Sequence, residues 1–234
     1  MRNLLAILVL LTSMSAMSQE IKYCGQTEQT EKLFQHFPDL QRDADQADEQ
    51  LLMEEQQFAE QRGGSPVIII PIVFHIIHEG GNENISDAQI HSQIDIINED
   101  FRRMNADRVN TPDIFKDVAA DVEIEFCLAT IDPNGYTTTG ITRTKTYNDG
   151  FHIFSGEFDF VKFDATGGRD AWATDQYLNM WVADLPLLLG YATFPETFSA
   201  DEQGVVMTST GFGNTGTAAA PFDLGRTATH EIGH

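Results

Sequence analysis

"VIIIPIVFHIIHE", residues 67–79, is a β-branched run that predicts a buried strand at the start of the globular part of the chain. A helix should follow it, because Ser86 and Gln89 have the spacing of a capping box. Apolar residues then recur at helical spacing and predict a long amphipathic helix over residues 87–105. These residues are Ile90, Ile94, Ile97, Phe101 and Met104. The domain should therefore open with a strand and a long helix.

Further strand candidates follow this helix. Residues 122–130, "VEIEFCLAT", alternate apolar and polar side chains, as a half-buried strand does. The other candidates are "ITRTKTY" (141–147), "YLNMWVADL" (177–185), "GYATFP" (190–195) and "GVVMTST" (204–210). We expect the 177–185 strand to be central, and residues 227–234 to begin a second helix. This order predicts an α+β fold with α/β-like parts, in which a long helix backs a twisted mixed β-sheet.

The composition excludes some classes of function. The chain has 234 residues, 41% of them hydrophobic, which indicates a globular protein with a sizeable core. With 14 Lys and Arg against 36 Asp and Glu, the formal net charge is −22. Nucleic acid requires a basic face on its partner, so this balance argues against nucleic-acid binding. The two cysteines, Cys24 and Cys127, are too few for a disulfide scaffold.

The first 65 residues have the features of a targeting segment and a leader. Arg2, followed by an apolar run at residues 4–11, predicts a signal peptide over residues 1–18, so we expect a secreted, extracellular protein. No apolar run is long enough to span a membrane. Residues 19–65 are acidic and poor in apolar side chains, which is typical of a loosely helical or partly disordered leader. The leader ends at a Gly-rich boundary that is suited to proteolytic cleavage.

The last residues, "THEIGH" at 229–234, have the spacing of a zinc site. On a helix, His230 and His234 would lie one turn apart on one face and point both imidazoles at one metal ion. Glu231 would act as the general base toward a zinc-activated water. The alternative is a fortuitous match, but Gly233 is a costly residue inside a purely structural helix. The pattern therefore favours a zinc site.

Two imidazoles do not complete a catalytic zinc site, which needs three protein ligands and an open position. No third ligand is obvious among the other histidines. His75 and His78 are three apart on the predicted strand, so they face opposite sides of the sheet. His36, His91 and His152 are better explained as surface or core residues. We expect the third ligand to lie outside this chain.

A series of motifs runs from residue 67 onward: "IPIVFHIIHEGG", "NISDAQIHSQIDIINEDFRRMNAD", "DVEIEFCLAT", "TTGITRT", "YLNMWVADL", "LLGYATFPE", "GVVM" and "GRTATHEIGH". In this order and spacing they resemble the pappalysin family of metzincin zinc endopeptidases. The resemblance implies that His230 and His234 are the first two zinc ligands and Glu231 the general base. It also implies that residues 66–234 are an upper catalytic subdomain. The third histidine, the C-terminal subdomain and any Ca²⁺ sites would then lie beyond His234, and this fragment should be inactive alone.

The resemblance also assigns roles to two other segments. "LGYATFP" is similar to the family's substrate-pairing edge strand, so Gly190, Tyr191 and Ala192 are candidates for main-chain contacts with a peptide, with an ordinary buried strand as the alternative. "YCGQTE" resembles the Cys-Gly segment of the family's propeptides, which implies an inhibitory propeptide over 19–65 with Cys24 as a latency switch. A Cys24–Cys127 disulfide is the alternative, and Cys127 would equally fit as a small core residue.

The sequence therefore predicts the precursor of a secreted zinc metalloendopeptidase that acts on protein or peptide substrates. Zn²⁺ would be its cofactor, and cleavage near Arg62 would remove the propeptide and activate the enzyme. The rival hypothesis is a non-catalytic secreted binding domain that carries the histidine motif by chance.

Overall fold

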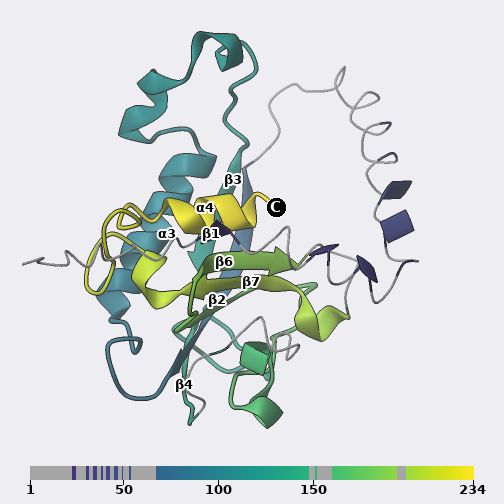
Figure 1. Cartoon of the computed structure of the whole chain (residues 1–234), viewed down its shortest axis with the longest axis vertical. Helices are drawn as coiled ribbons and strands as arrows, with labels where there is room; N and C mark the ends of the chain where they lie inside the picture. Colours follow the sequence, from purple (N-terminus) through teal and green to yellow (C-terminus); the bar gives the residue numbers. More distant parts are fainter. Residues whose placement is uncertain are drawn as a thin grey trace, which may run out of the picture.

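The computed structural model describes residues 67–147, 151, 160–193 and 199–234, together with Tyr23, Cys24 and scattered positions between 30 and 53. Its main feature is a seven-stranded mixed β-sheet that packs against helices α3 and α4 (Figure 1). The strands lie in the order β1-β6-β7-β5-β2-β3, and β4 also pairs with β2. The predicted α+β fold with a mixed sheet is therefore confirmed.

The strand predicted at residues 67–79 organises this sheet. The strands are β1 (Tyr23–Cys24), β2 (Ile68–His78), β3 (Ile124–Leu128), β4 (Ile141–Lys145), β5 (Leu178–Ala183), β6 (Leu188–Thr193) and β7 (Gly204–Thr208). β3 pairs with the first half of β2 and β4 with the second half, while β5 runs along the other edge of β2, all in parallel. β5 lies between β2 and β7, as predicted for a central strand. β6 is antiparallel to β7, and β1 is parallel to β6.

The two faces of β2 enter two different parts of the core. Phe74 and Ile76 pack into the main cluster with residues of α3 and α4. His75 and Ile77 alternate with them and point to the opposite face, where Trp181 of β5 is also buried. Burial on both faces explains why this strand is a nearly continuous apolar run.

The long helix is shorter than its apolar spacing predicts. α3 spans Asp87–Phe101 instead of residues 87–105, because Arg102 caps it and Arg103 adopts a left-handed backbone conformation with φ of 49°. Met104 is 56% exposed as a result. Ser86 caps the helix as predicted, with its hydroxyl accepting from the Gln89 backbone N–H. The other half of the capping box is wrong, because the buried Gln89 side chain donates to carbonyls of the loop after β7.

The remaining helices among the described residues are short. The second α-helix, α4, spans Arg226–Ile232. The 3₁₀ turns are η2 (Ala106–Asn110), η3 (Asp113–Phe115), η5 (Phe160–Lys162), η6 (Asp164–Thr166), η7 (Ala200–Glu202) and η8 (Ser209–Gly211). Strand β3 begins at Ile124, later than expected, because Glu123 has a positive φ of 57°. Cys127 is exposed, so the alternative of a small core residue is wrong.

Several predictions fall outside the described residues. These are the signal peptide at 1–18, the cleavage boundary near Arg62, and the histidines His36 and His152. Of the leader, the structure places chiefly the short strand β1. Within the described parts of the chain, no helix has the length and apolar character needed to cross a membrane.

Candidate active site

Helix α4 carries the histidine motif and is fitted closely against α3. It starts after Gly225, whose φ of 67° is left-handed, and a Cβ there would meet Ile96 Cδ1 at 2.5 Å. Gln93 of α3 donates to the Gly225 carbonyl at 2.9 Å. Ala228 and Glu231 then form the buried face of α4, about one turn apart. The left-handed backbone and the close contact with Ile96 favour glycine at position 225, directly before the first residue of α4.

His230 and His234 come together at the exposed end of α4. Their Nε2 atoms are 3.1 Å apart, and the two rings meet edge to face with centroids 4.6 Å apart. Partial burial and the neighbouring His230 lower the pKa of His234. Two imidazole nitrogens bound to one tetrahedral zinc at 2.0–2.1 Å would be about 3.3 Å apart. The observed spacing is close to that value, so the pair fits a shared metal ion.

Glu231 lies on the buried side of the same helix turn. Its side chain is fully buried, and its Oε1 atom has no hydrogen-bond partner among the described residues. Burial raises the pKa of Glu231 to about 7, although the hydrogen bond that it accepts from Cys24 acts in the opposite direction. A buried carboxylate with one unpartnered oxygen is poised to accept a proton from a nearby group.

Cys24 of the leader lies over this helix end, far along the chain from it. Its Sγ donates to Glu231 Oε2 at 3.5 Å and lies 3.6 Å from His234 Nε2. Sulfur and nitrogen ligands at their usual distances from one tetrahedral zinc would be about 3.6 Å apart. The ligand atoms of Cys24, His230, Glu231 and His234 all lie within 4.8 Å of one another. The donor set therefore suits zinc.

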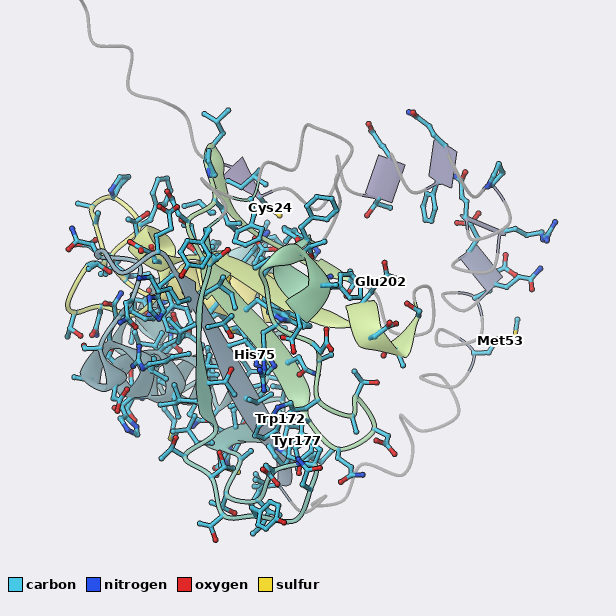
Figure 2. The ribbon with its side chains drawn as sticks, turned by 90° about the horizontal axis from the view of Figure 1, so that it is seen from below. Cys24, Met53, His75, Trp172, Tyr177 and Glu202 are labelled. Atoms are coloured by element: carbon cyan, nitrogen blue, oxygen red, sulfur yellow. The ribbon has the colours of Figure 1, made fainter. Side chains whose placement is uncertain are left out.

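The alternative of a Cys24–Cys127 disulfide is wrong. Neither Cys24 nor Cys127 is in a disulfide, and Cys127 is exposed on β3, which lies at the opposite end of the strand order from β1. Figure 2 shows Cys24 on the leader strand.

The edge strand predicted to bind substrate is β6, and the leader occupies it. β1 pairs with β6 in parallel, and Cys24 is in register with Gly190. Gly190 also provides room for helix α4, since a Cβ there would meet Glu231 Cγ at 3.0 Å. Tyr191 and Ala192 are buried, so their side chains belong to the core and only their main chain is available for pairing.

The other described histidines lie apart from this cluster. His75 is buried, with Nδ1 2.8 Å from Thr142 Oγ1 and Nε2 3.0 Å from Asn179 Oδ1. Burial lowers the pKa of His75 to about 4. Figure 2 shows it beside Trp172 and well apart from Cys24. His78 follows on the opposite strand face, and His91 is exposed on α3. The prediction that they are core or surface residues is confirmed for these three.

The chain is similar in sequence and structure to known metalloproteases, although no protein-family model matches it. A mutant of promirolysin from Tannerella forsythia is 44% identical, with a TM-score of 0.73 over 91% of this chain and 68% of that one. The chain belongs to the mirolysin family of metzincin-type metalloproteases. Its membership of the pappalysin family stays a prediction.

Two other metalloproteases are similar to a shorter part of this chain. Mature mirolysin in complex with a cleaved peptide is 53% identical, with a TM-score of 0.69 over 73% of this chain and 63% of that chain. Extracellular metalloprotease 1 of Coccidioides posadasii is 27% identical over 178 residues, which are 71% of this chain and 50% of the relative. This chain thus spans about half of the curated relative and under two thirds of mature mirolysin.

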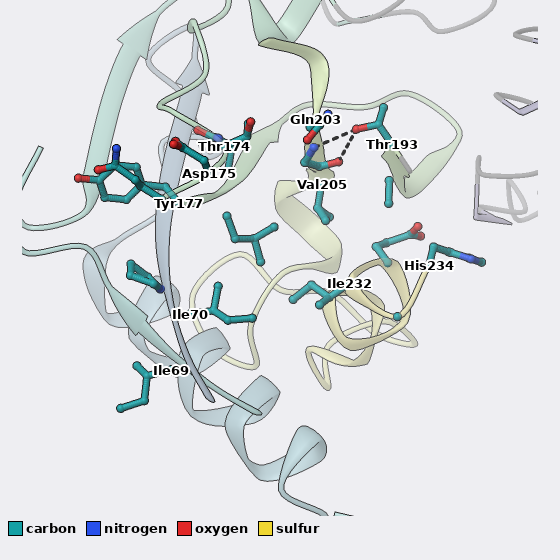
Figure 3. A pocket seen from close by; sticks show the side chains of 18 residues that line it. Ile69, Ile70, Thr174, Asp175, Tyr177, Thr193, Gln203, Val205, Ile232 and His234 are labelled. Carbon is teal, nitrogen blue, oxygen red and sulfur yellow. Dashed lines mark hydrogen bonds between the residues drawn. The ribbon is translucent and has the colours of Figure 1, made fainter. Parts of the chain in front are cut away.

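A cavity of about 640 Å³ adjoins the histidine helix, and no sequence pattern indicates it. Figure 3 shows Ile232 and His234 on one side of this cavity and Tyr177 with Asp175 on the other. Its walls come from the starts of β2, β5 and β7, the end of β6, and the end of α4. Strand pairing brings these distant segments together only in the folded chain, so no local sequence pattern indicates the cavity. In this mirolysin relative the cavity lies open beside the candidate metal site.

Proposed function

We propose that this chain is the precursor of a secreted zinc metalloendopeptidase. Residues 1–18 would be the signal peptide, 19–65 the inhibitory propeptide, and 66–234 the upper catalytic subdomain. The third zinc ligand, the C-terminal subdomain and any Ca²⁺ site would come from the rest of the protein. Membership of the mirolysin family supports a protease, and the extracellular relative supports export. Assignment to the pappalysin branch rests on the sequence motifs alone.

The observation that carries the proposal is the convergence of four donor groups at one point. His230 Nε2 and His234 Nε2 are 3.1 Å apart, and the Cys24 thiol lies 3.6 Å from His234 Nε2. These spacings are close to those of ligands around one tetrahedral zinc ion. A fortuitous motif would not be expected to gather a thiol from a segment more than two hundred residues away.

Glu231 would be the general base and acid of peptide hydrolysis. When bound, zinc would supply a Lewis acid that lowers the pKa of water and polarises the scissile carbonyl. The Glu231 carboxylate lies next to the two imidazoles, held by burial on α4 and by the space above Gly190. From there it can take a proton from the attacking water and pass it to the leaving amine.

The substrate would be an extended protein or peptide segment that pairs with β6. In the precursor β1 fills this edge, with Cys24 opposite Gly190. A substrate backbone would replace β1 and pair with Gly190, Tyr191 and Ala192 through their main chain, as in β-augmentation. The cleaved peptide in the mirolysin complex is consistent with a peptide substrate for a relative of this chain.

The same contacts would keep the precursor latent. The Cys24 thiol contacts Glu231 and His234, and the β1 backbone occupies the edge strand. A thiolate at the zinc would fill the position that water needs. Cleavage near Arg62 would remove the leader, and would thereby free both the metal site and the edge of β6 at the same time.

Replacing Glu231 tests the catalytic proposal. In the intact protein after propeptide removal, Glu231→Ala should lower the rate of casein cleavage by about 10²–10⁴-fold, because proton transfer is lost. Zinc content, measured by atomic spectroscopy, should be unchanged. Equal cleavage by the variant would refute the general-base role. Absence of both zinc and cleavage from the unmodified protein would favour the binding-domain hypothesis.

A further inference from the structure

The carboxylate of Asp100 on α3 is directed at the histidine helix. Its side chain is only 5% exposed, although aspartate is ordinarily a surface residue. Asp100 Oδ2 accepts a hydrogen bond from Thr229 Oγ1 at 2.6 Å, and Asp100 Oδ1 lies 2.9 Å from a guanidinium nitrogen of Arg226. Both partners belong to α4. A buried carboxylate is thus devoted to this one short helix.

The two partners stand one helical turn apart and close to the candidate metal ligands. Thr229 immediately precedes His230, and Arg226 is the first residue of α4. Residues three apart share a helix face, so Asp100 contacts α4 along one side. The other guanidinium nitrogen of Arg226 binds Asp107 at 2.8 Å, which holds this face from the outside as well.

Helix α4 packs its apolar side, with Ala228, into the core, and the polar contacts of Asp100 act along a different side of the helix. It is seven residues long, and no side chain caps its first turn. Isolated helices of this length are unstable, so contacts from neighbouring elements must hold it in place. A small rotation of α4 would move the His230 and His234 nitrogens away from the point at which they now meet.

We propose that Asp100 is a positioning residue for the metal centre, which orients His230 and His234 through Thr229 and Arg226. The inference rests on the proposed zinc site and adds a determinant of its metal affinity on a different helix. Groups that orient metal ligands without touching the ion commonly change metal affinity by about 10- to 100-fold when they are removed.

Asn98 provides a matched control on the same helix. Its side-chain amide donates to the Phe126 carbonyl at 2.9 Å and accepts from the Phe126 N–H at 2.7 Å, so it ties α3 to β3. Asn98→Ala removes a comparable polar tether without touching α4. A purely structural role for Asp100 predicts that both variants lose stability and keep the same metal affinity.

The test measures zinc release from the intact, processed protein into excess chelator. Asp100→Ala should release zinc about tenfold faster than the unmodified protein, and Asn98→Ala within about twofold of it. Thr229→Val, which replaces the hydroxyl with a methyl group and so removes the hydrogen bond to Asp100, should also speed release. The Asp100→Ala/Thr229→Val double variant should release zinc no faster than Asp100→Ala, because both substitutions remove the same hydrogen bond between Thr229 and Asp100. With Co²⁺ in place of zinc, the visible absorption should shift in Asp100→Ala and not in Asn98→Ala.

Equal release rates for Asp100→Ala and Asn98→Ala would overturn the inference. If Asp100→Ala does not fold, Thr229→Val decides the matter, and an unchanged release rate in that variant would overturn it. Failure of the unmodified protein to bind zinc would instead refute the proposed function, so the two failures are distinguishable.

Discussion

At the scale of single residues, His75 shows how the fold decides the state of a titratable group. Nε2 donates to Asn179 Oδ1, which leaves Nδ1 to accept from the Thr142 hydroxyl. The Trp172 backbone holds Asn179 in place. The Trp172 N–H donates to Asn179 Oδ1 at 2.7 Å, and Asn179 Nδ2 donates to the Trp172 carbonyl at 2.8 Å. These contacts satisfy a neutral imidazole. Burial opposes its protonation and lowers the pKa of His75 to about 4.

The lowered pKa of His75 predicts a pH dependence of stability. The unfolded chain binds the proton near pH 6.5 and the folded chain only near pH 4, so stability is present above 6.5 and is lost as pH falls toward 4. Between pH 7 and pH 5 this residue should cost about 2 kcal/mol of unfolding free energy. The unfolding free energy of His75→Gln, measured by urea unfolding, should not show that part of the decrease between pH 7 and pH 5. The exposed His91→Gln should keep it, and an identical pH slope in His75→Gln and unmodified protein would contradict the prediction.

Other residues have roles that no sequence pattern indicates. Gln89 has the spacing of a capping-box residue, but its side chain is buried and binds carbonyls of Ser209 and Phe212. Asp100 lies among polar helix positions, and its side chain is nonetheless only 5% exposed, in contact with α4. Helical periodicity distinguishes apolar from polar residues. It cannot indicate that a polar residue faces a second helix that comes more than a hundred residues later.

At the scale of elements, the strands and helices with regular apolar patterns are those that the sequence predicts best. β2, β5 and α3 bury continuous or periodic apolar residues, and each was predicted within a few residues. β1 was not predicted as a strand. It has two residues, and it is defined only by its pairing with β6. Such pairing depends on the tertiary arrangement and leaves no periodic signal.

The leader strand β1 predicts a measurable latency. In the unprocessed precursor, Cys24→Ala should raise peptide-cleaving activity, because the thiol no longer covers Glu231 and His234. The measurement is the initial rate of cleavage of a quenched fluorescent peptide before any leader removal. Cys127→Ala is the matched control, since Cys127 is a free and exposed thiol. A Cys24→Ala precursor as inactive as the unmodified one would show that β1 pairing alone, or another contact, maintains latency.

At the scale of the whole molecule, three distant segments meet at one edge of the sheet. The leader brings Cys24, β6 brings the strand edge that β1 pairs with, and α4 brings His230, Glu231 and His234 (Figure 1). The motif spacing in α4 was sufficient to predict that its two imidazoles converge. The approach of the leader thiol was expected only from a family resemblance. The cavity beside the site was not foreseen, because its walls are separate strand ends.

The proposed catalysis, latency and positioning role of Asp100 all depend on His230 and His234 holding a metal ion. The most direct test is the zinc content of the intact, dialysed protein, measured by mass spectrometry of the metal. We predict about one zinc ion per molecule, and its loss in the His230→Ala/His234→Ala double variant when that variant retains its folded circular-dichroism spectrum. Retention of the full zinc content in the folded double variant would contradict the claim.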